Sequence, residues 1–324
     1  MKAFVTDVAG FVGSSIARRL FSQRAEVVGI NSFTPYYARE LKDANLPSLD
    51  SHGCTFVAAD MNEFDPGSRD DVDVIYHPAG QPGERSSWGS EFGSHMRNKV
   101  LATQPLLEPA RDSSLLLRFV YASKSSVYGD ANRFAALETD VLRPVSPYSV
   151  TKLAGEQLVS LYETTFGVAT ISLRHVTVYD PRQRPDIAFI RFSTRPSPAE
   201  ELPSLSSGEE IRDFTFIDDI VNANLLASTS NRTRPGDVVN VSGGSSISVH
   251  EGLAINAELA GTELNIQRVA RAYGGANRNG EACDHAAKLL GWHSSVTIRE
   301  SLTSQLEWIR SRQDIWTPLP ANAA

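Results

Sequence analysis

The chain has 324 residues, of which 41% are hydrophobic and 21% charged, and its formal net charge is −7. This length allows one large core or two moderate domains, and the acidic balance without a basic run argues against a nucleic-acid partner. Cys54 and Cys283 are the only cysteines, so we expect no disulfide framework, no metal site and a reducing, cytoplasmic compartment. No apolar signal core or membrane-spanning run is expected either.

The first segments of the chain predict a strand, a glycine turn and a helix. Residues 2–6 form the strand, the turn runs to Gly13, and the helix begins at Ser14. In this context backbone amides and a helix N-terminus can face a pyrophosphate. A second strand, 25–30, ends at Asn31, about 20 residues past the glycines, where a ribose-binding side chain is expected.

Further strands are predicted at 55–59, 72–77, 116–122 and 169–173. Strands that alternate with helices predict an α/β fold with a Rossmann-type, doubly wound parallel sheet. Ligands of such sheets bind beyond the carboxyl ends of the strands. The residues near those ends are Gly10, Asn31, Asp60, Ala79, Ser125 and His175.

A long helix is predicted over 88–112, although Pro105 and Pro109 must kink or shorten it. The second half of the chain is less regular. It predicts a strand at 211–217 and helices at 218–228, 249–260, 284–290 and 297–312.

Tyr148 and Lys152 form the most informative pair in the sequence. Pro147 suits the first turn of a helix, and residues four apart share a helix face, so the phenol and the ammonium meet. A phenol titrates near ~10 in water, and a neighbouring cation favours the phenolate. We therefore expect Tyr148 to act as a general base near neutral pH. The same spacing also occurs on many surface helices, so its context decides.

That context resembles a known family, the extended short-chain dehydrogenases/reductases that act on nucleotide sugars, and most of all the UDP-glucuronate 4-epimerases. The similarity runs from Met1 to about Arg310. It implies an NAD-binding Rossmann domain over 1–175 with return segments from 209–241, a substrate-binding domain over 176–324, and a homodimer. Its markers are Gly10–Gly13, Phe33–Tyr37, Gln81–Gly83 with Trp88, Tyr148–Glu156, Pro181–Asp186 and Ile211–Thr215.

The resemblance also implies roles for single residues. Tyr148 and Lys152 match the catalytic pair, and Ser125 or Ser126 is expected to supply the assisting hydroxyl. Besides the catalytic pair, the residues that match NAD-binding positions are Gly10, Phe11, Val12, Gly13, Asn31, Ser32, Asp60, Met61, Ala79, Gly80, Asn98 and His175.

The UDP-sugar substrate is expected to meet several arginines, because bidentate charged contacts suit a diphosphate and a carboxylate. Thr177 and Arg184 match positions near the sugar carboxylate. The other residues expected at the substrate are Arg85, Arg191, Arg212 and Arg271.

The chain departs from the family pattern at several of these positions. Asp7 replaces the first glycine of the turn, which adds a charge and a Cβ beside the expected pyrophosphate. Asn31 replaces the acidic residue at the ribose and no longer repels a 2′-phosphate, so NAD and NADP both stay open. Lys124 replaces the hydroxyl that assists the tyrosine, and Asp180 stands where the family has glycine. We expect Asp7 and Lys124 to slow the enzyme.

Three functions remain open. The first is NAD-dependent epimerisation at C4 of a UDP-uronic acid, UDP-glucuronate to UDP-galacturonate, through a 4-keto intermediate. The second is another reaction of a nucleotide sugar, decarboxylation or dehydration, but relatives with those activities carry a glutamate where this chain has Ser126. The third is a catalytically silent relative that binds nucleotide sugars. Intact Tyr148 and Lys152 favour an enzyme, and we expect the epimerase.

Overall fold

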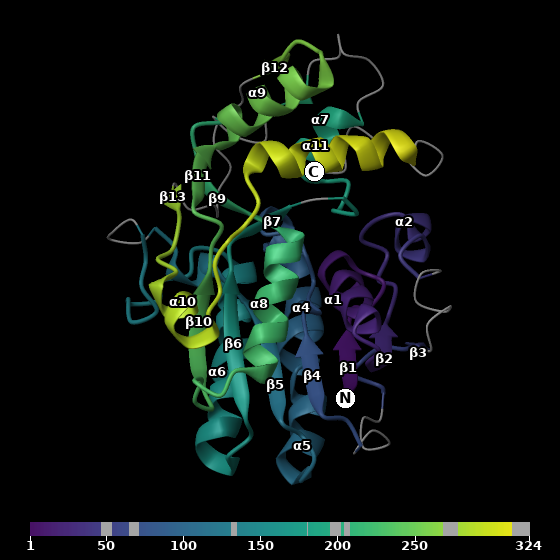
Figure 1. Ribbon diagram of the computed structural model, residues 1–324, viewed down its shortest axis with the longest axis vertical. Coiled ribbons are helices and arrows are strands. Elements are labelled where there is room, and N and C mark those ends of the chain that lie inside the picture. The colour runs from purple at the N-terminus through teal and green to yellow at the C-terminus, as the bar shows by residue number, and fades with distance from the viewer. Residues whose placement is uncertain are drawn as a thin grey trace.

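The computed structural model describes residues 1–46, 54–64, 71–130, 135–179, 181–194, 202–203, 208–267 and 278–312. Seven strands, paired in parallel throughout, form its main sheet (Figure 1). The predicted doubly wound sheet is confirmed, and each predicted strand of it is present with its ends shifted by at most two residues. In spatial order the strands are β10 (Asp237–Val241), β6 (Thr170–His175), β5 (Arg118–Lys124), β4 (Val74–His77), β1 (Lys2–Thr6), β2 (Glu26–Asn31) and β3 (Cys54–Ala58).

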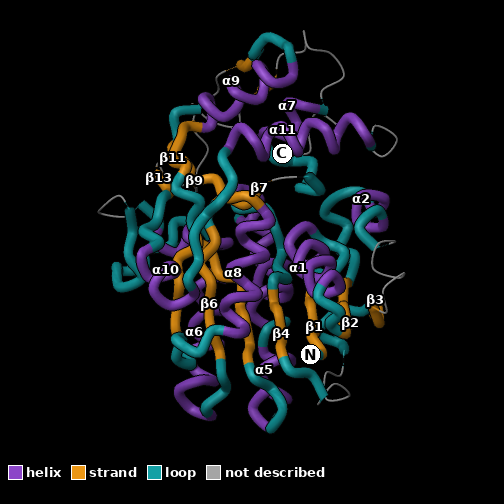
Figure 2. The backbone as a smooth tube through the Cα atoms, in the orientation of Figure 1, coloured by secondary structure: helices purple, strands orange, loops and turns teal. Residues whose placement is uncertain are grey.

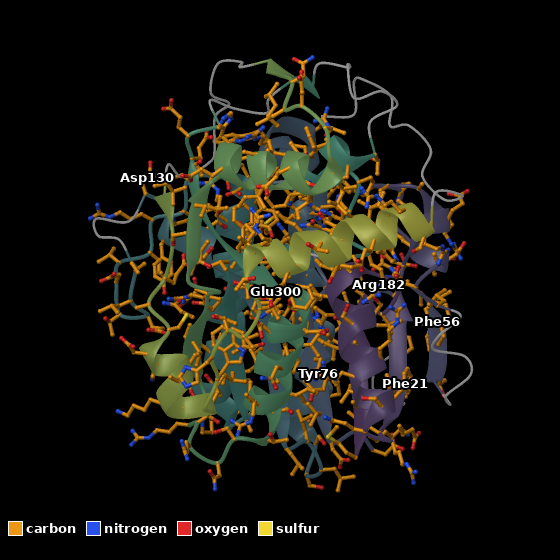
Figure 3. All side chains as sticks on the ribbon, turned by 45° about the horizontal axis from the view of Figure 1, so that its top comes forward. Phe21, Phe56, Tyr76, Asp130, Arg182 and Glu300 are labelled. Carbon is orange, nitrogen blue, oxygen red and sulfur yellow. The ribbon has the colours of Figure 1, made fainter. Side chains whose placement is uncertain are left out.

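Helices cover both faces of this sheet (Figure 2). On one face α1 (Phe11–Ser22), α8 (Ile217–Thr229) and α10 (Asp284–Leu290) pack their apolar sides on the strands. Tyr76 of β4 reaches this layer, and its hydroxyl lies 2.7 Å from Ser228 Oγ of α8 (Figure 3). On the other face α5 (Gln104–Asp112) and α6 (Pro147–Phe166) do the same. Each large apolar side chain buried this way contributes roughly 1.5–3 kcal/mol.

The order of the strands reverses between β1 and β4, since the chain builds outward from β1 in one direction and from β4 in the other. A crevice forms at such a switch point, at the carboxyl ends of the two strands. Asp7 follows β1 and the loop Pro78–Gly80 follows β4, so both segments border this crevice.

The predicted helix over 88–112 is wrong as one continuous element: it is interrupted ahead of Pro105, whereas Pro109 lies inside α5, which continues to Asp112. Short 3₁₀ turns, η2 (Arg85–Ser87) and η3 (Gly89–Glu91), precede α4 (Phe92–His95). A π-helical turn, η4 (Met96–Leu101), follows, and α5 then restarts with Pro105 in its first turn. Proline has no backbone N–H to donate and is tolerated there, while π turns are frequent at functional sites.

A second layer of structure lies over the carboxyl ends of the main strands (Figure 1). Within the return segment predicted from 209–241, β10 joins the main sheet, whereas β9 pairs with strands of this layer. The helices predicted at 249–260 and 284–290 are confirmed. The elements of the layer are β7 (Thr177–Tyr179), α7 (Ala188–Ser193), β8 (Leu202–Pro203), β9 (Ile211–Phe216), β11 (Ser245–Ser248), α9 (Val249–Ala260), β12 (Ile266–Gln267), β13 (Arg278–Asn279) and α11 (Ile298–Ser311).

Local signals explain how the helices of this layer begin. Ser248 starts α9 and Thr297 starts α11, each through a capping box with the glutamate three residues on, Glu251 and Glu300. Both boxes satisfy backbone N–H groups that a helix start leaves free. Among the described helices none is long and apolar enough to cross a membrane.

Candidate active site

Helix α6 carries Tyr148 and Lys152 over the ends of the central strands. Its start is confirmed: Ser146 Oγ accepts a hydrogen bond from the Ser149 N–H at 3.2 Å, and Pro147 occupies the first turn. Lys152 is buried, and its Nζ donates to the Ala122 carbonyl at 2.7 Å. The loop after β4 also lies against Lys152, because a Cβ on residue 80 would be 3.4 Å from Lys152 Nζ. The predicted pair and the predicted loop therefore meet.

The electrostatics of Tyr148 differ from the expectation. Burial raises the pKa of Tyr148 above its ordinary value and the charge of Glu84 raises it further, whereas Arg184 lowers it. Burial, together with the charge of Lys124, lowers the pKa of Lys152 to about 8. The net shift of the phenol is away from phenolate, opposite to the expected direction, because burial and the charge of Glu84 outweigh the charge of Arg184. Tyr148 needs further positive charge beside it to act as a base near neutral pH.

Lys99 is a site residue that the sequence did not reveal. Its Nζ lies 3.3 Å from the centroid of the Tyr148 ring, 2.9 Å from His95 Nδ1 and 3.3 Å from Thr151 Oγ1. Burial lowers the pKa of Lys99 to about 5, and the charge of Lys152 contributes. Lys99 is therefore a neutral amine over the ring at neutral pH. The position of Lys99 depends on the π-helical turn η4, and no pattern in the sequence predicted that turn.

Glu84 also approaches the catalytic helix unexpectedly. Its Oε1 accepts hydrogen bonds from Ser146 Oγ at 3.2 Å and Ser149 Oγ at 3.1 Å. Ser149 Oγ lies 2.9 Å from Ser126 Oγ. Ser126, at the end of β5, is thereby linked through Ser149 to the first turn of α6. The one sequence signal for Glu84 was its place as a charged residue directly after the Gln81–Gly83 marker.

Lys124 does not occupy the place that its sequence position suggested. Its Nζ donates to the Val176 carbonyl at 2.6 Å, toward the link between β6 and β7. Burial lowers the pKa of Lys124 to about 8, although Glu84 and Glu281 oppose the shift. Ser125 is buried and hydrogen-bonds Glu281, whose pKa burial raises to about 8. Lys124 is thus within electrostatic reach of two acidic residues, Glu84 and Glu281.

The glycine turn after β1 has the form expected of a dinucleotide-binding turn, with one foreign side chain. Gly10 N donates to the Asp7 carbonyl at 2.8 Å and closes the turn ahead of Phe11 and Val12, the first residues of α1. A Cβ on Gly13 would lie 2.2 Å from the Asp7 carbonyl oxygen, so glycine lets α1 pack against β1. A Cβ on Gly10 would lie 2.0 Å from Asp7 Oδ2, because the carboxylate fills that space.

A pocket opens at the switch point. Asn98 Nδ2 donates to Gln81 Oε1 at 3.0 Å on one wall, and Asp60 pairs with Arg97 at 2.8 Å on another. The walls contain half of the residues predicted to bind the cofactor, namely Asn31, Ser32, Asp60, Met61, Ala79, Gly80 and Asn98.

The remaining predicted cofactor residue, His175, ends β6 and is buried. Burial, with the charges of Lys152 and Lys124, lowers its pKa to about 3, so the ring is neutral. Its Nε2 is buried and has no hydrogen-bond partner among the described residues. A glycine turn at a helix start, a polar pocket beside it and an unpaired ring nitrogen near Lys152 fit a dinucleotide.

Arg184 lies within electrostatic reach of the catalytic tyrosine, as its effect on the pKa of Tyr148 shows. Its Nε is 3.3 Å from Asp186 Oδ1, and Tyr36 Oη donates to Asp186 Oδ2 at 3.2 Å. Two family markers that are far apart in the chain are thereby joined at the site. Thr177 begins β7, which pairs with β9.

The other predicted substrate arginines come from three different elements. Arg212 of β9 donates to the Ile211 carbonyl at 2.9 Å, and its charge lowers the pKa of Lys124. Burial lowers the pKa of Arg85, and the charge of Arg191 adds to the shift, so these two arginines lie within electrostatic reach of each other. Arg271 and Asp180 lie outside the described residues.

Comparisons with known proteins agree with this geometry. A family model described as "NAD dependent epimerase/dehydratase family" matches residues 3–242. The uncharacterized UDP-glucose epimerase YtcB of Bacillus subtilis is 34% identical over 314 residues, covering 96% of this chain and 98% of that protein. UDP-glucuronate 4-epimerase 1 of Arabidopsis thaliana is 32% identical over 249 residues, 73% of this chain and 57% of that protein. The crystal structure of UDP-glucuronic acid 4-epimerase from Bacillus cereus, in complex with UDP-glucuronic acid and NAD, matches with a TM-score of 0.92 at 32% identity, covering 96% and 99% of the two chains.

Proposed function

Because this chain belongs to the NAD dependent epimerase/dehydratase family, we propose that it interconverts UDP-glucuronate and UDP-galacturonate through a 4-keto intermediate. One observation carries the proposal: α6 holds Tyr148 and Lys152 against the loop at Gly80, and Arg184 is within electrostatic reach of the phenol. The Bacillus cereus and Arabidopsis thaliana relatives support the same substrate class.

The chain's own residues move one proton in this reaction. When bound, NAD supplies the hydride acceptor and donor at C4, and its nicotinamide ring adds positive charge. Tyr148 takes the proton of the sugar's 4-hydroxyl and returns it to the 4-keto oxygen after the sugar has turned over. Lys152, buried beside Gly80, holds the position of the reacting groups. Arg184 favours the phenolate, since its charge lowers the pKa of Tyr148.

The sugar carboxylate decides whether carbon dioxide is lost. A 4-keto uronate is a β-keto acid, and its carboxylate leaves only when that C–C bond aligns with the π system of the ketone. We propose that Thr177 and Arg184 hold the carboxylate out of alignment, because a bidentate pair fixes geometry as well as charge. The expected product is therefore the epimer, with little UDP-pentose.

Decarboxylation or dehydration is the second candidate function, and one observation favours it. The carboxyl group of Glu281 hydrogen-bonds Ser125, and burial raises its pKa to about 8, so it is a protonated acid at neutral pH. Glu84 contacts Ser149, the neighbour of Ser126. Acidic groups thus stand near the two serines, although Ser126 itself replaces the glutamate of those relatives.

A homodimer in the cytoplasm completes the proposal. We expect the two subunits to meet through the helices of 88–112 and 147–167, and both segments expose apolar side chains. Leu101 is 52% exposed in η4, and Val150 and Leu161 are 46% and 54% exposed in α6. Apolar side chains grouped on one surface mark interaction sites. Sedimentation at micromolar concentration is expected to give a dimer, and a monomer would remove this part of the proposal.

The reaction is tested by incubating the protein with UDP-glucuronate and saturating NAD and resolving the products by proton NMR. UDP-galacturonate at equilibrium with UDP-glucuronate is the expected result. A UDP-pentose or a dehydrated sugar as main product would favour the second candidate. No product from the native protein would favour a silent relative. Tyr148→Phe is the control, since any conversion by a contaminating enzyme would persist in it.

A further inference from the structure

Two departures from the family pattern lie in direct contact at the dinucleotide site. The parallel register places Thr6 opposite Ile30, so the next residues, Asp7 and Asn31, stand side by side. Asn31 Nδ2 donates to Asp7 Oδ1 at 2.7 Å, and Asn31 Oδ1 accepts from the Phe33 N–H at 2.7 Å. Both polar ends of the Asn31 amide are therefore engaged within the protein, and the amide holds the carboxylate in place.

The Asp7 carboxylate occupies a defined space in the turn. Asp7 has φ = 52°, a conformation that glycine favours. Its Oδ2 occupies the space that a Cβ on Gly10 would need. Among the described residues, Asn31 is the side chain that donates a hydrogen bond to the Asp7 carboxylate, and it does so at Oδ1. Asp7 also lines the pocket together with Ser32 and Thr34, so this carboxylate stands at the site rather than behind it.

The walls of the pocket carry negative charge and no positive charge. Asp7 and Asp60 are the charged residues among those described that line it. The cations that act on these carboxylates are engaged by other groups. Lys42 of α2 (Arg39–Asp43) donates its Nζ to the Thr34 carbonyl at 2.6 Å, and Lys152 donates to a carbonyl of β5. Arg184 pairs with Asp186 at 3.3 Å, and Arg97 pairs with Asp60 itself at 2.8 Å. An adenosine 2′-phosphate carries about −1.5 to −2 charges. Among the described residues that line the pocket it would meet the Asp7 carboxylate and no unpaired guanidinium, whereas a 2′-hydroxyl can donate to that carboxylate.

We propose that Asp7, positioned by Asn31, is the carboxylate that selects NAD over NADP in this protein. Compared with the family pattern, which has glycine at position 7 and an acidic residue at position 31, the acidic group has moved from the end of β2 to the turn after β1. The combined charge of the two positions is unchanged. The inference rests on the proposed function only in that the pocket receives a nicotinamide dinucleotide. It settles a choice that Asn31, taken alone, leaves open.

The test is the ratio of the NAD and NADP dissociation constants, measured by titration calorimetry at pH 8. The native protein is expected to prefer NAD by roughly tenfold or more. Asp7→Asn keeps the shape of the side chain and removes its charge, so its preference should fall at least roughly tenfold. The double variant Asp7→Gly/Asn31→Asp, with the acid returned to β2, should recover it. Using the ratio cancels any effect of Asp7 on the diphosphate that both ligands share.

The pH dependence of that ratio separates charge from shape. Burial raises the pKa of Asp7 to about 6, against the charges of Lys42, Arg184 and Lys152 and the hydrogen bond from Asn31. The preference should thus be full at pH 8 and weaken as Asp7 is protonated toward pH 5.5. The 2′-phosphate also titrates near pH ~6, so the comparison is with Asp7→Asn, in which only the ligand titrates.

An unchanged NAD/NADP ratio in Asp7→Asn would overturn the inference, and so would native protein that binds both dinucleotides equally. A native protein that prefers NAD through Asp7 but converts no UDP-glucuronate would leave the inference standing and remove the proposed reaction. A native protein that binds neither dinucleotide would contradict both.

Discussion

The catalytic helix and the glycine turn, which border one site, have changed in opposite ways. In α6 the pair Tyr148 and Lys152 matches the family pattern, while Glu84 and Lys124 place charges, and Lys99 a neutral amine, around it. The unfamiliar residues Asp7, in the turn, and Asn31, at the end of β2, both line the pocket and are joined by a hydrogen bond. In the first region the proposed reaction requires particular reacting groups. In the second, cofactor binding requires only that the pocket keep its negative charge and its shape.

The two regions are also anchored differently. Glu156 of α6 forms a buried ion pair with Arg174 of β6, with Nη2–Oε1 at 2.6 Å and Nε–Oε2 at 3.0 Å. The Asp7 carboxylate, by contrast, accepts one hydrogen bond from an amide and stays desolvated. The helix is therefore anchored to β6 by a buried ion pair, whereas the desolvated Asp7 carboxylate lowers the free energy of unfolding.

The largest effect is expected at the reacting oxygen. Tyr148→Phe should lower turnover roughly a thousandfold or more, because the lost hydroxyl carries the proton. Affinity for UDP-glucuronate should stay near the native value, since that oxygen acts mainly in the transition state. Calorimetric binding and NMR turnover of the same preparation measure the two quantities. Turnover within tenfold of native would mean that another group is the base.

Breaking the anchor of the catalytic helix should cost stability. Glu156→Ala leaves the Arg174 guanidinium buried without its partner, which typically costs ~3–5 kcal/mol of unfolding free energy. The matched control is Glu258→Ala, which breaks the exposed ion pair with Arg299 (2.8 Å) and should change little. Urea unfolding measures both. Equal losses in the two variants would show that the buried pair has no special role.

Asp7→Asn should stabilise the fold at alkaline pH. The pKa of Asp7 is raised from 3.8 to about 6 by burial, so the folded state favours the protonated acid. Stability from this group is full below the lower pKa and lost as the pH rises through the higher one. The variant should gain roughly 1–3 kcal/mol at pH 8 and much less at pH 4. A gain that does not depend on pH would contradict the assignment of the buried charge.

Lys124→Ser should change turnover least, raising it a few-fold. The charge of Lys124 lowers the pKa of Lys152, so its removal keeps Lys152 charged at higher pH. Serine also restores the hydroxyl that the family places there. Lys124→Met removes the charge without adding the hydroxyl, and comparing the pH–rate profiles of the two variants separates these effects. Loss of activity in both would make Lys124 a catalytic group.

The sequence predicted what depends on local spacing. The alternating strands, the glycine turn and the i,i+4 pair of Tyr148 and Lys152 follow from neighbours in the chain. The pKa of Tyr148 could not be predicted, because burial dominates it and burial depends on the whole fold. Glu84 reaches Ser149 across 65 residues of sequence. Lys99 reaches the tyrosine through a π turn, and a period of 3.6 residues gives no sign of it.

Asp7 and Asn31 lie between these cases. Each is visible in the sequence as a departure, and each alone argues for weaker or less selective cofactor binding. Only the strand register, with Thr6 opposite Ile30, shows that they are neighbours. Two changes that look like losses one at a time then form a single arrangement that keeps a carboxylate in the wall of the pocket.

The most direct test of the central claim is the fate of hydrogen on the sugar during turnover in deuterium oxide. If C4 loses and regains the same hydride while Tyr148 moves only the hydroxyl proton, the UDP-galacturonate formed retains full proton NMR intensity at C4 and C5. Loss of the C5 signal would show that the enzyme removes a carbon-bound proton next to the ketone. Loss of the C4 signal would show that the hydrogen at C4 exchanges with solvent, and either result would contradict the proposed reaction.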